Sequence, residues 1–316
     1  MGKTKGLMFL KRGWMLFKKR FFNKDDSFVK ILFFYAILIF MVFVSVYPLL
    51  NILSISLRPG SNLYTDSLKI IPDGATLENF KKMLFGIEGR YNELEISFRS
   101  FIESDFMGYL KNSLSISLVS TVVTVLLSVT AAYAFSRYKF RGKGVLLSSF
   151  LITQIFPAPM LLLPTYILLY KLGFIGKFWT LVIPYVATAV PFCVWTLKGF
   201  FDTVPFSIEE SAYVDGANLR QIFFRIVMPL SLPAIGVASL FAFTNAWNEY
   251  IVARIILSER SMYTLPIALT NMSGSFNTDW GIFAAASLIT AIPVIVVFIA
   301  LSKFMVNGLT LGGVKG

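Results

Sequence analysis

The chain has 316 residues, of which 56% are hydrophobic and 15% charged, and its formal net charge is +12. Soluble globular proteins average about 45–50% apolar residues, so the excess indicates a membrane protein. A single cysteine and no histidine exclude an intrachain disulfide, a proton relay through histidine and a serine–histidine triad, and they argue against a Cys/His metal site.

Long windows without Asp, Glu, Lys or Arg divide the chain into candidate membrane spans. A helix rises about 1.5 Å per residue, so roughly 20 apolar residues cross a hydrocarbon core of about 30 Å. Six windows are long enough, and we predict six spans at 31–57, 112–136, 144–170, 178–197, 226–248 and 280–302. A further charge-free window, 261–278, is rich in Ser, Thr and Asn, and we predict a loop there because polar groups are costly in lipid.

The basic residues are unevenly distributed between the two sides of this predicted bundle. If the N-terminus lies inside, 18 of the 29 basic residues fall on inside segments. Cytoplasmic loops are enriched in Lys and Arg, so the charge predicts cytoplasmic N- and C-termini and not nucleic-acid binding. In the basic segment 1–30, Lys and Arg alternate with Trp and Phe, which fits either an interfacial helix on an anionic leaflet or a disordered tail.

Local signals fill in the first half of the chain. In the extracytoplasmic loop 58–111, Asp73-Gly74 indicates a turn and Thr76 can cap a following helix. Span 2 carries small hydroxyl residues at helical spacing, which favour close helix–helix contact: Ser113, Ser117, Ser120, Thr124 and Ser128. Spans 3 and 4 contain prolines, which kink helices; such a pair either lines a pathway or simply packs in the bundle.

Polar residues enter span 5 near its outer end. Asn245, Asn248 and Glu249, beside Trp247, are spaced so that they would share one helix face. They could line a solute path, bond to neighbouring helices, or lie exposed at the membrane interface. No nucleophile–base pair is present, and Gly2-Lys3-Thr4 lacks the rest of a phosphate loop. The sequence therefore predicts no catalytic residue, metal ligand or cofactor in this chain.

Segment 203–229 has the pattern of a helix–turn–helix element. Ser207 and Glu210 form a capping-box pattern, Gly216 allows a sharp turn, and Asn218 with Gln221 begins a second helix. The predicted topology places this element in the cytoplasm. A short amphipathic knob there suits docking into a groove of another protein, although an ordinary connector fits the same pattern.

The same segment resembles the EAA loop of ABC-transporter importer permeases. The matching residues are Glu210, Ser211, Ala212, Asp215, Gly216, Ala217, Ile226, Met228 and Pro229. Ser211 and Met228 depart from the family pattern, which has alanine and leucine there. The resemblance implies a coupling helix seated in a cleft of an ATP-binding subunit, where Glu210 would face a basic residue; Glu210 could instead cap its own helix.

The C-terminal residues 304–316 are similar to the end of the MalG-type subunit of maltose and maltodextrin permeases. The Gly-rich tail 307–316 is predicted not to hold a helix. The resemblance implies that this tail reaches between the ATPase subunits, through Asn307, Gly308, Gly312, Gly313 and Lys315; a frayed tail is the alternative. Residues 258–280 take the place of the family's outer loop, which contacts the sugar-binding protein.

The resemblance implies an all-α, polytopic type I ABC importer permease (MetI-like) fold in the bacterial plasma (inner) membrane, with a transmembrane domain over 31–306. Its implied partners are a second, MalF-like permease, a dimer of ATP-binding subunits that hold ATP and Mg, and an extracytoplasmic binding protein that delivers an oligosaccharide, malto-oligosaccharide first. The alternative is an ion-coupled secondary transporter without an ATPase, for which the sequence offers Glu249 near one membrane edge and no Asp, Lys or His within the predicted spans.

Overall fold

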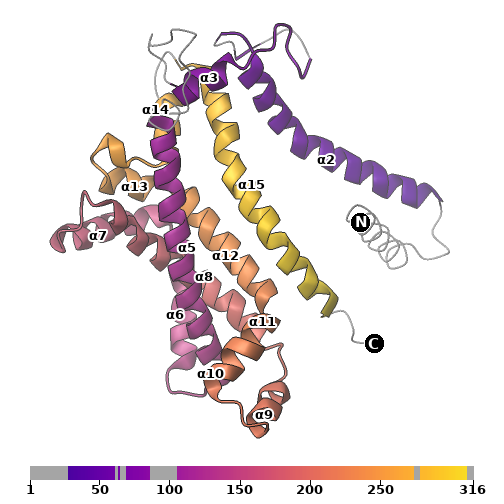
Figure 1. Ribbon diagram of the computed structural model, residues 1–316, viewed down its shortest axis with the longest axis vertical. Coiled ribbons are helices and arrows are strands. Elements are labelled where there is room, and N and C mark those ends of the chain that lie inside the picture. The colour runs from indigo at the N-terminus through magenta and orange to yellow at the C-terminus, as the bar shows by residue number, and fades with distance from the viewer. Residues whose placement is uncertain (1–27, 61–62, 65–68, 86–104, 274–277, 312–316) are drawn as a thin grey trace.

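The computed structural model describes residues 28–60, 63–64, 69–85, 105–273 and 278–311, and the regular structure in these ranges is helical throughout (Figure 1). Four of the helices described are long and apolar enough to cross a membrane, and the number rises to six if each of two bent helix pairs is one span. The four are α2 (Phe28–Leu57), α5 (Asp105–Arg137), α8 (Val182–Phe201, after the 3₁₀ turn η1, Phe178–Leu181) and α15 (Trp280–Leu311).

Helix α5 lies at the centre of the bundle, because it packs along both α8 and α12 (Leu232–Trp247). The hydroxyl side chains that were predicted to face other helices are all buried, each at most 2% exposed: Ser113, Ser117, Ser120, Thr124 and Ser128. Small side chains let helix backbones approach closely, which confirms that prediction. Helix α15 adds a second layer by packing against α12, α2 and α3 (Glu78–Phe85).

Helix α2 joins the bundle near its C-terminal end and diverges from α15 toward its N-terminal end (Figure 1). Large apolar side chains are exposed on all sides of its N-terminal half, including Leu32, Phe33 and Phe40. A continuous apolar surface of this kind suits hydrocarbon or another membrane helix rather than water.

Two predicted spans are bent rather than straight. Predicted span 144–170 consists of α6 (Lys143–Ile155) and α7 (Ala158–Lys171), which meet at 108°. Pro157 lies at the break; it has no N–H, and it forces the preceding Phe156 into an extended conformation.

The predicted fifth span bends by 76° near Ser231, where α12 begins. The preceding segment is a short helical run with one wide turn. It comprises α10 (Leu219–Ile222), the π-turn η2 (Phe223–Val227) and α11 (Met228–Leu230). Within the bundle, the fifth span therefore consists of α12 alone. The preceding α10, η2 and α11 belong to the predicted helix–turn–helix segment.

The prediction of a loop over 261–278 is wrong, because α14 (Leu265–Ser273) forms there after the 3₁₀ turn η3 (Arg260–Met262). The Leu265 N–H donates to Ser113 Oγ of α5 at 2.7 Å. That bond satisfies a donor that the first turn of a helix leaves unpaired. Leu265 and Ile267 are buried, so one apolar face held against α5 compensates for the polar composition.

The prediction that the chain cannot be helical beyond Asn307 is also wrong, because α15 continues through Gly308 to Leu311. Glycine costs only about 1 kcal/mol in a helix interior, which a long preceding helix tolerates. Gly312, Gly313 and Lys315 lie outside the described residues, as does most of the basic segment 1–30.

The turn and cap predicted before α3 are confirmed. Gly74 has a φ of +74°, and Thr76 Oγ1 accepts a hydrogen bond from the Glu78 N–H at 3.1 Å. Asn79 then enters a buried site, where its Nδ2 donates to the carbonyl oxygens of Ser56 at 3.0 Å and Arg58 at 2.9 Å. This amide therefore fastens α3 to the C-terminal end of α2.

Gly281, in the first turn of α15, lies directly against the same amide. A Cβ at this position would be 2.5 Å from Asn79 Nδ2, which is closer than a carbon atom can approach. Three helix ends thus meet at one side chain, and the third helix contributes a glycine because there is no room for more.

Replacing Gly281 with alanine is expected to destabilise this junction, since the methyl group would displace the amide from two buried carbonyls. Leaving such groups unsatisfied costs about 1–3 kcal/mol. The thermal unfolding midpoint of the purified chain should fall. In an Asn79→Ala background the same replacement should have a clearly smaller effect; equal effects in both backgrounds would contradict the contact.

Candidate functional site

The helix–turn–helix element at one end of the bundle begins with α9 (Phe206–Val214). Pro205 occupies the cap position and no side chain caps the helix, so the predicted capping box of Ser207 and Glu210 does not form. The Ser207 carbonyl instead accepts a hydrogen bond from Ser211 Oγ at 2.9 Å. Glu210 is exposed, and the alternative that it caps its own helix is wrong.

The turn after α9 is fixed by backbone geometry, as predicted. Gly216 has a φ of +84°, a left-handed conformation that side chains resist. Its N–H donates to the carbonyl of Tyr213 at 3.0 Å, and the Ala217 N–H donates to that of Ala212 at 3.0 Å. These two bonds form a Schellman motif, which ends the helix and satisfies its last carbonyls.

The second helix of the element starts with a complete capping box, which confirms the prediction for Asn218 and Gln221. The Asn218 side chain accepts from the Gln221 N–H at 2.9 Å, and the Gln221 side chain accepts from the Asn218 N–H at 2.9 Å. With the turn before it, this box gives the element a single, well-defined shape.

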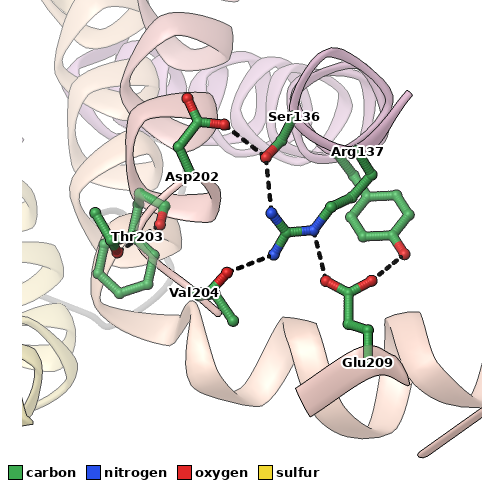
Figure 2. A network of polar contacts seen from close by, with 8 residues as sticks. Ser136, Arg137, Asp202, Thr203, Val204 and Glu209 are labelled. Atoms are coloured by element: carbon green, nitrogen blue, oxygen red, sulfur yellow. Dashed lines mark hydrogen bonds and ion pairs between the residues drawn. The ribbon is translucent and has the colours of Figure 1, made fainter. Parts of the chain in front are cut away.

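Glu209, beside Glu210, points into the protein and forms a buried ion pair with Arg137 (Figure 2). Arg137 Nε donates to Oε1 at 2.5 Å, and Tyr133 donates its hydroxyl to Oε2 at 2.8 Å. The remaining guanidinium nitrogens donate to the Val204 carbonyl at 3.0 Å and to Ser136 Oγ at 3.1 Å. Both charged side chains are less than 10% exposed, so these bonds replace the water that each has lost.

The network continues from Ser136 to the end of α8. Ser136 Oγ donates to Asp202 Oδ1 at 2.7 Å, and Lys198 Nζ binds Oδ2 at 2.5 Å. Burial raises the pKa of Asp202, but the hydrogen bonds from Lys198 and Ser136 outweigh it, so this pKa lies below its ordinary value. Three helices, α5, α8 and α9, are thus joined by one chain of charged and polar groups.

Sequence reasoning missed the role of Glu209. Consecutive helical residues point about 100° apart, so of two adjacent glutamates one can face inward while the other faces out. The available signal was Arg137, which ends a charge-free window and could pair with an inward-facing acid.

A cavity of about 420 Å³ opens between the end of α5 and the helices α9 and α10. Aromatic and aliphatic side chains dominate its lining, and both members of the ion pair and Glu210 also border it. Tyr213 and Val214 in this lining are 68% and 85% exposed. Exposed apolar groups beside an exposed acid are typical of a protein-binding surface.

The other residues of the loop motif fall into two groups. Glu210, Ser211, Asp215, Gly216 and Pro229 are exposed. The small or apolar residues Ala212, Ala217 and Met228 pack against the buried cluster beneath, and Ile226 is half-buried. The motif therefore combines an exposed acidic face with a second face that attaches the element to the bundle.

The four residues that were candidates for a solute path do not lie together on one helix face. Helix α12 ends at Trp247 and Asn248 is its cap, so the predicted shared face is wrong. The Glu249 carboxylate accepts from the N–H groups of Val252 and Ala253 at 2.8 and 3.1 Å, and so caps α13 (Ile251–Ile256).

Each of the other path candidates has its own surroundings. Trp247 is buried and stacks on Phe243, whereas Asn248 is exposed. Asn245 donates to Thr188 Oγ1 at 3.1 Å. Among the described residues, no group of three or more His, Cys, Asp or Glu side chains could hold a metal ion.

Residues 124–306 match the family model described as binding-protein-dependent transport system inner membrane component. Three curated proteins resemble the chain over most of its length. GanQ, the galactooligosaccharides transport system permease protein of Bacillus subtilis, is 34% identical over 93% of this chain and 98% of its own. The inner membrane ABC transporter permease protein YcjP of Escherichia coli is 34% identical over 90% and 96%. The maltose/maltodextrin transport system permease protein MalG of Yersinia pestis is 39% identical over 85% and 88%.

A crystal structure of a bacterial ABC transporter involved in the import of the acidic polysaccharide alginate contains a chain of the same fold. Its TM-score is 0.70, with 90% of this chain and 99% of that chain covered and 21% sequence identity. The fold is therefore that of an ABC importer permease. Together, the family match and the long relatives show that this chain belongs to the family of inner membrane components of binding-protein-dependent transport systems.

Proposed function

We propose that the chain is a permease subunit of an ATP-driven sugar importer and that α9 docks on the ATP-binding subunit. One observation carries the docking assignment. Glu209 is paired with Arg137 inside the protein, whereas the next residue, Glu210, is exposed beside the apolar side chains of Tyr213 and Val214. A helix held this firmly with an exposed acidic and apolar face suits a rigid contact that transmits force.

The proposed orientation places the α9 end and both termini in the cytoplasm. The segment from the last residue of α5 to the first residue of α6, at the same end as α9, carries Arg137, Lys139, Arg141 and Lys143. Basic residues accumulate on the cytoplasmic side, which supports this orientation. ATP and Mg would then be held by a partner subunit dimer, and a second permease chain and an extracytoplasmic binding protein would complete the importer.

In this proposal, ATP-driven closure of the partner subunits moves α9, and the buried network passes the movement to the bundle. Arg137 joins α9 to α5, and Ser136 and Asp202 extend the connection to α8. The bundle would then change between inward-open and outward-open states because ATP-bound partners favour one of them.

An oligosaccharide is the proposed solute. Two of the relatives are named for different sugars, galactooligosaccharides and maltose or maltodextrin, at 34% and 39% identity, so both classes are candidates. An ion-coupled transporter is disfavoured because Glu249, the acid that it would need, caps α13 and also accepts the Tyr185 hydroxyl at 3.0 Å.

The direct test is gentle purification of the tagged chain from its own membrane, with its partners identified, followed by uptake assays in proteoliposomes. We expect an ATP-binding subunit and a second permease to co-purify, and uptake of malto- or galacto-oligosaccharide to require ATP. Uptake driven by an ion gradient without ATP, by a chain that purifies alone, would overturn the proposal.

Gly216→Pro is expected to abolish ATP-driven uptake while the chain still inserts, because proline fixes φ near −65° and the turn requires +84°. Gly216→Ala should be milder, at roughly 1–2 kcal/mol of strain. Membrane fractionation would verify insertion of both variants. Wild-type transport by Gly216→Pro would contradict the role of this turn.

Glu210→Lys is expected to weaken retention of the ATP-binding subunit during purification, since an exposed acid would be replaced by a repelling charge. Glu209→Gln serves as the neighbouring control. It should lower the thermal unfolding midpoint but leave most of the ATP-binding subunit bound. The measurement is the ratio of ATP-binding subunit to permease after washing. An unchanged ratio for Glu210→Lys would exclude Glu210 from the contact.

Removing one partner of the buried pair, as in Arg137→Ala, is expected to cost about 3–5 kcal/mol, because it leaves a buried carboxylate uncompensated. Thermal unfolding of the assembled complex would report the loss. The matched control is Lys198→Ala, which breaks a more exposed pair at the same end and should cost about 1 kcal/mol or less. If the two variants lost similar amounts of stability, the buried pair would contribute no more than the exposed one, and the prediction would be wrong.

A further inference from the structure

Three polar side chains from three different helices meet on the surface of the bundle. Asn245 Nδ2 of α12 donates to Thr188 Oγ1 of α8 at 3.1 Å, and Gln154 Nε2 of α6 donates to the Thr188 carbonyl at 3.2 Å. Both hydrogen bonds are exposed, in contrast to the buried network around Arg137. The carboxamide oxygens of Gln154 and Asn245 accept no hydrogen bond from the part of the chain that is described, so they can still bind another molecule.

Counted along its helices from the α9 end, this cluster lies more than halfway across a hydrocarbon core of about 30 Å. Helices α6, α8 and α12 reach the α9 end at Lys143, Phe201 and Leu232. The three polar residues are 11 to 13 positions away from those ends, or roughly 17–20 Å along a helix. Exposed amide groups at that depth are costly in a hydrocarbon core of about 30 Å, so lipid does not suit them.

An aromatic pair lies beside the cluster, one helical turn nearer the α9 end. Phe192 and Phe241 stack with their ring centroids 3.9 Å apart, and Phe192 is 38% exposed. Phe192 follows Thr188 by four positions and Phe241 precedes Asn245 by four, so each ring shares a helix face with a polar residue. Sugar rings present hydroxyl groups and apolar C–H faces, and amides beside aromatic rings complement both.

The backbone gives an independent indication of water at this place. Helix α6 ends at Ile155, immediately after Gln154, and the chain then turns by 108° through extended Phe156 and Pro157. Irregular backbone at membrane depth is tolerated where it is buried in protein or lines a water-filled cavity. Phe156 is 54% exposed, so burial within this chain does not account for the break.

We propose that Gln154, Thr188 and Asn245, together with the aromatic pair Phe192 and Phe241, form a sugar-contacting face of the transport path. This assignment rests on the proposed function as a sugar importer and specifies which part of this chain meets the solute. The carboxamide oxygens of Gln154 and Asn245 accept from sugar hydroxyls. Thr188 holds the Asn245 amide in place, because its hydroxyl donates to the Tyr185 carbonyl at 3.0 Å and accepts from Asn245. The exposed ring of Phe192 supports the apolar side of the sugar.

The first test measures water access and needs no knowledge of the solute. In the complete complex in membrane vesicles, the single buried Cys193 is replaced by alanine. Gln154→Cys, Thr188→Cys and Asn245→Cys are then treated with a charged methanethiosulfonate reagent. All three should react. The control is Leu126→Cys on α5, an exposed apolar site about 17 Å from the α9 end, which should not.

Lack of reaction at the three positions would overturn the proposal. Reaction that appears only when the second permease is absent would do the same, because it would mean that the face packs against that partner. The thiol test remains decisive even if the wild-type complex shows no ATP-dependent sugar uptake, an outcome that would refute the proposed function separately.

The second test measures sugar uptake and ATP hydrolysis in the same proteoliposomes. Asn245→Ala and Gln154→Ala should each lower uptake about three- to tenfold, the effect of losing one or two hydrogen bonds. ATP hydrolysis stimulated by the loaded binding protein should stay within about twofold of wild type, so that less sugar is moved per ATP.

The matched control is Thr153→Val on α6. Its hydroxyl is bound to its own helix, at the Phe150 carbonyl, so its loss should leave uptake unchanged. Wild-type uptake by both alanine variants would refute sugar contact. A parallel fall in uptake, ATP hydrolysis and thermal stability would show a structural role instead.

Discussion

The buried ion pair between Arg137 and Glu209 is the interaction on which the α9 end depends. Desolvating two charges is expensive, and the cost is offset here because the pair is also bonded to Tyr133, Ser136 and the Val204 carbonyl. With Glu209 directed inward, helix geometry leaves Glu210 and the turn residues facing outward. One internal contact thus decides which of the two adjacent glutamates lies at the surface of α9.

Helix α5 connects this contact with the opposite end of the bundle. Its 33 residues span about 50 Å, with Arg137 in its last turn and Asn112 and Ser113 near its start. Asn112 donates to the carbonyls of Ser261 and Tyr263, and Ser113 accepts the first N–H of α14. Between these ends the buried hydroxyl stripe holds α5 close to α8 and α12. The segments at both ends of the bundle are therefore attached to the same helix.

Features encoded by neighbouring residues could be predicted from the sequence, whereas features set by distant contacts could not. The spans follow from runs without charge, and the turn at Gly216 and the box of Asn218 with Gln221 follow from local backbone chemistry. The inward direction of Glu209 depends on Arg137, 72 positions away, and α14 depends on a hydroxyl group of α5. Prolines indicated kinks but not that the chain would turn by 108° near Pro157.

The separation of Arg137 and Glu209 in the sequence has a consequence for how the protein is made. Helices α6, α7 and α8 lie between them, so the pair closes only after these have been inserted and α8 has come to rest against α5. A newly made chain whose middle helices were misplaced would leave the Glu209 carboxylate without Arg137, and α9 would lose the contact that fixes it. If α9 docks on an ATP-binding subunit as proposed, that docking would act as a check on biogenesis, since only correctly assembled copies would present a fixed α9.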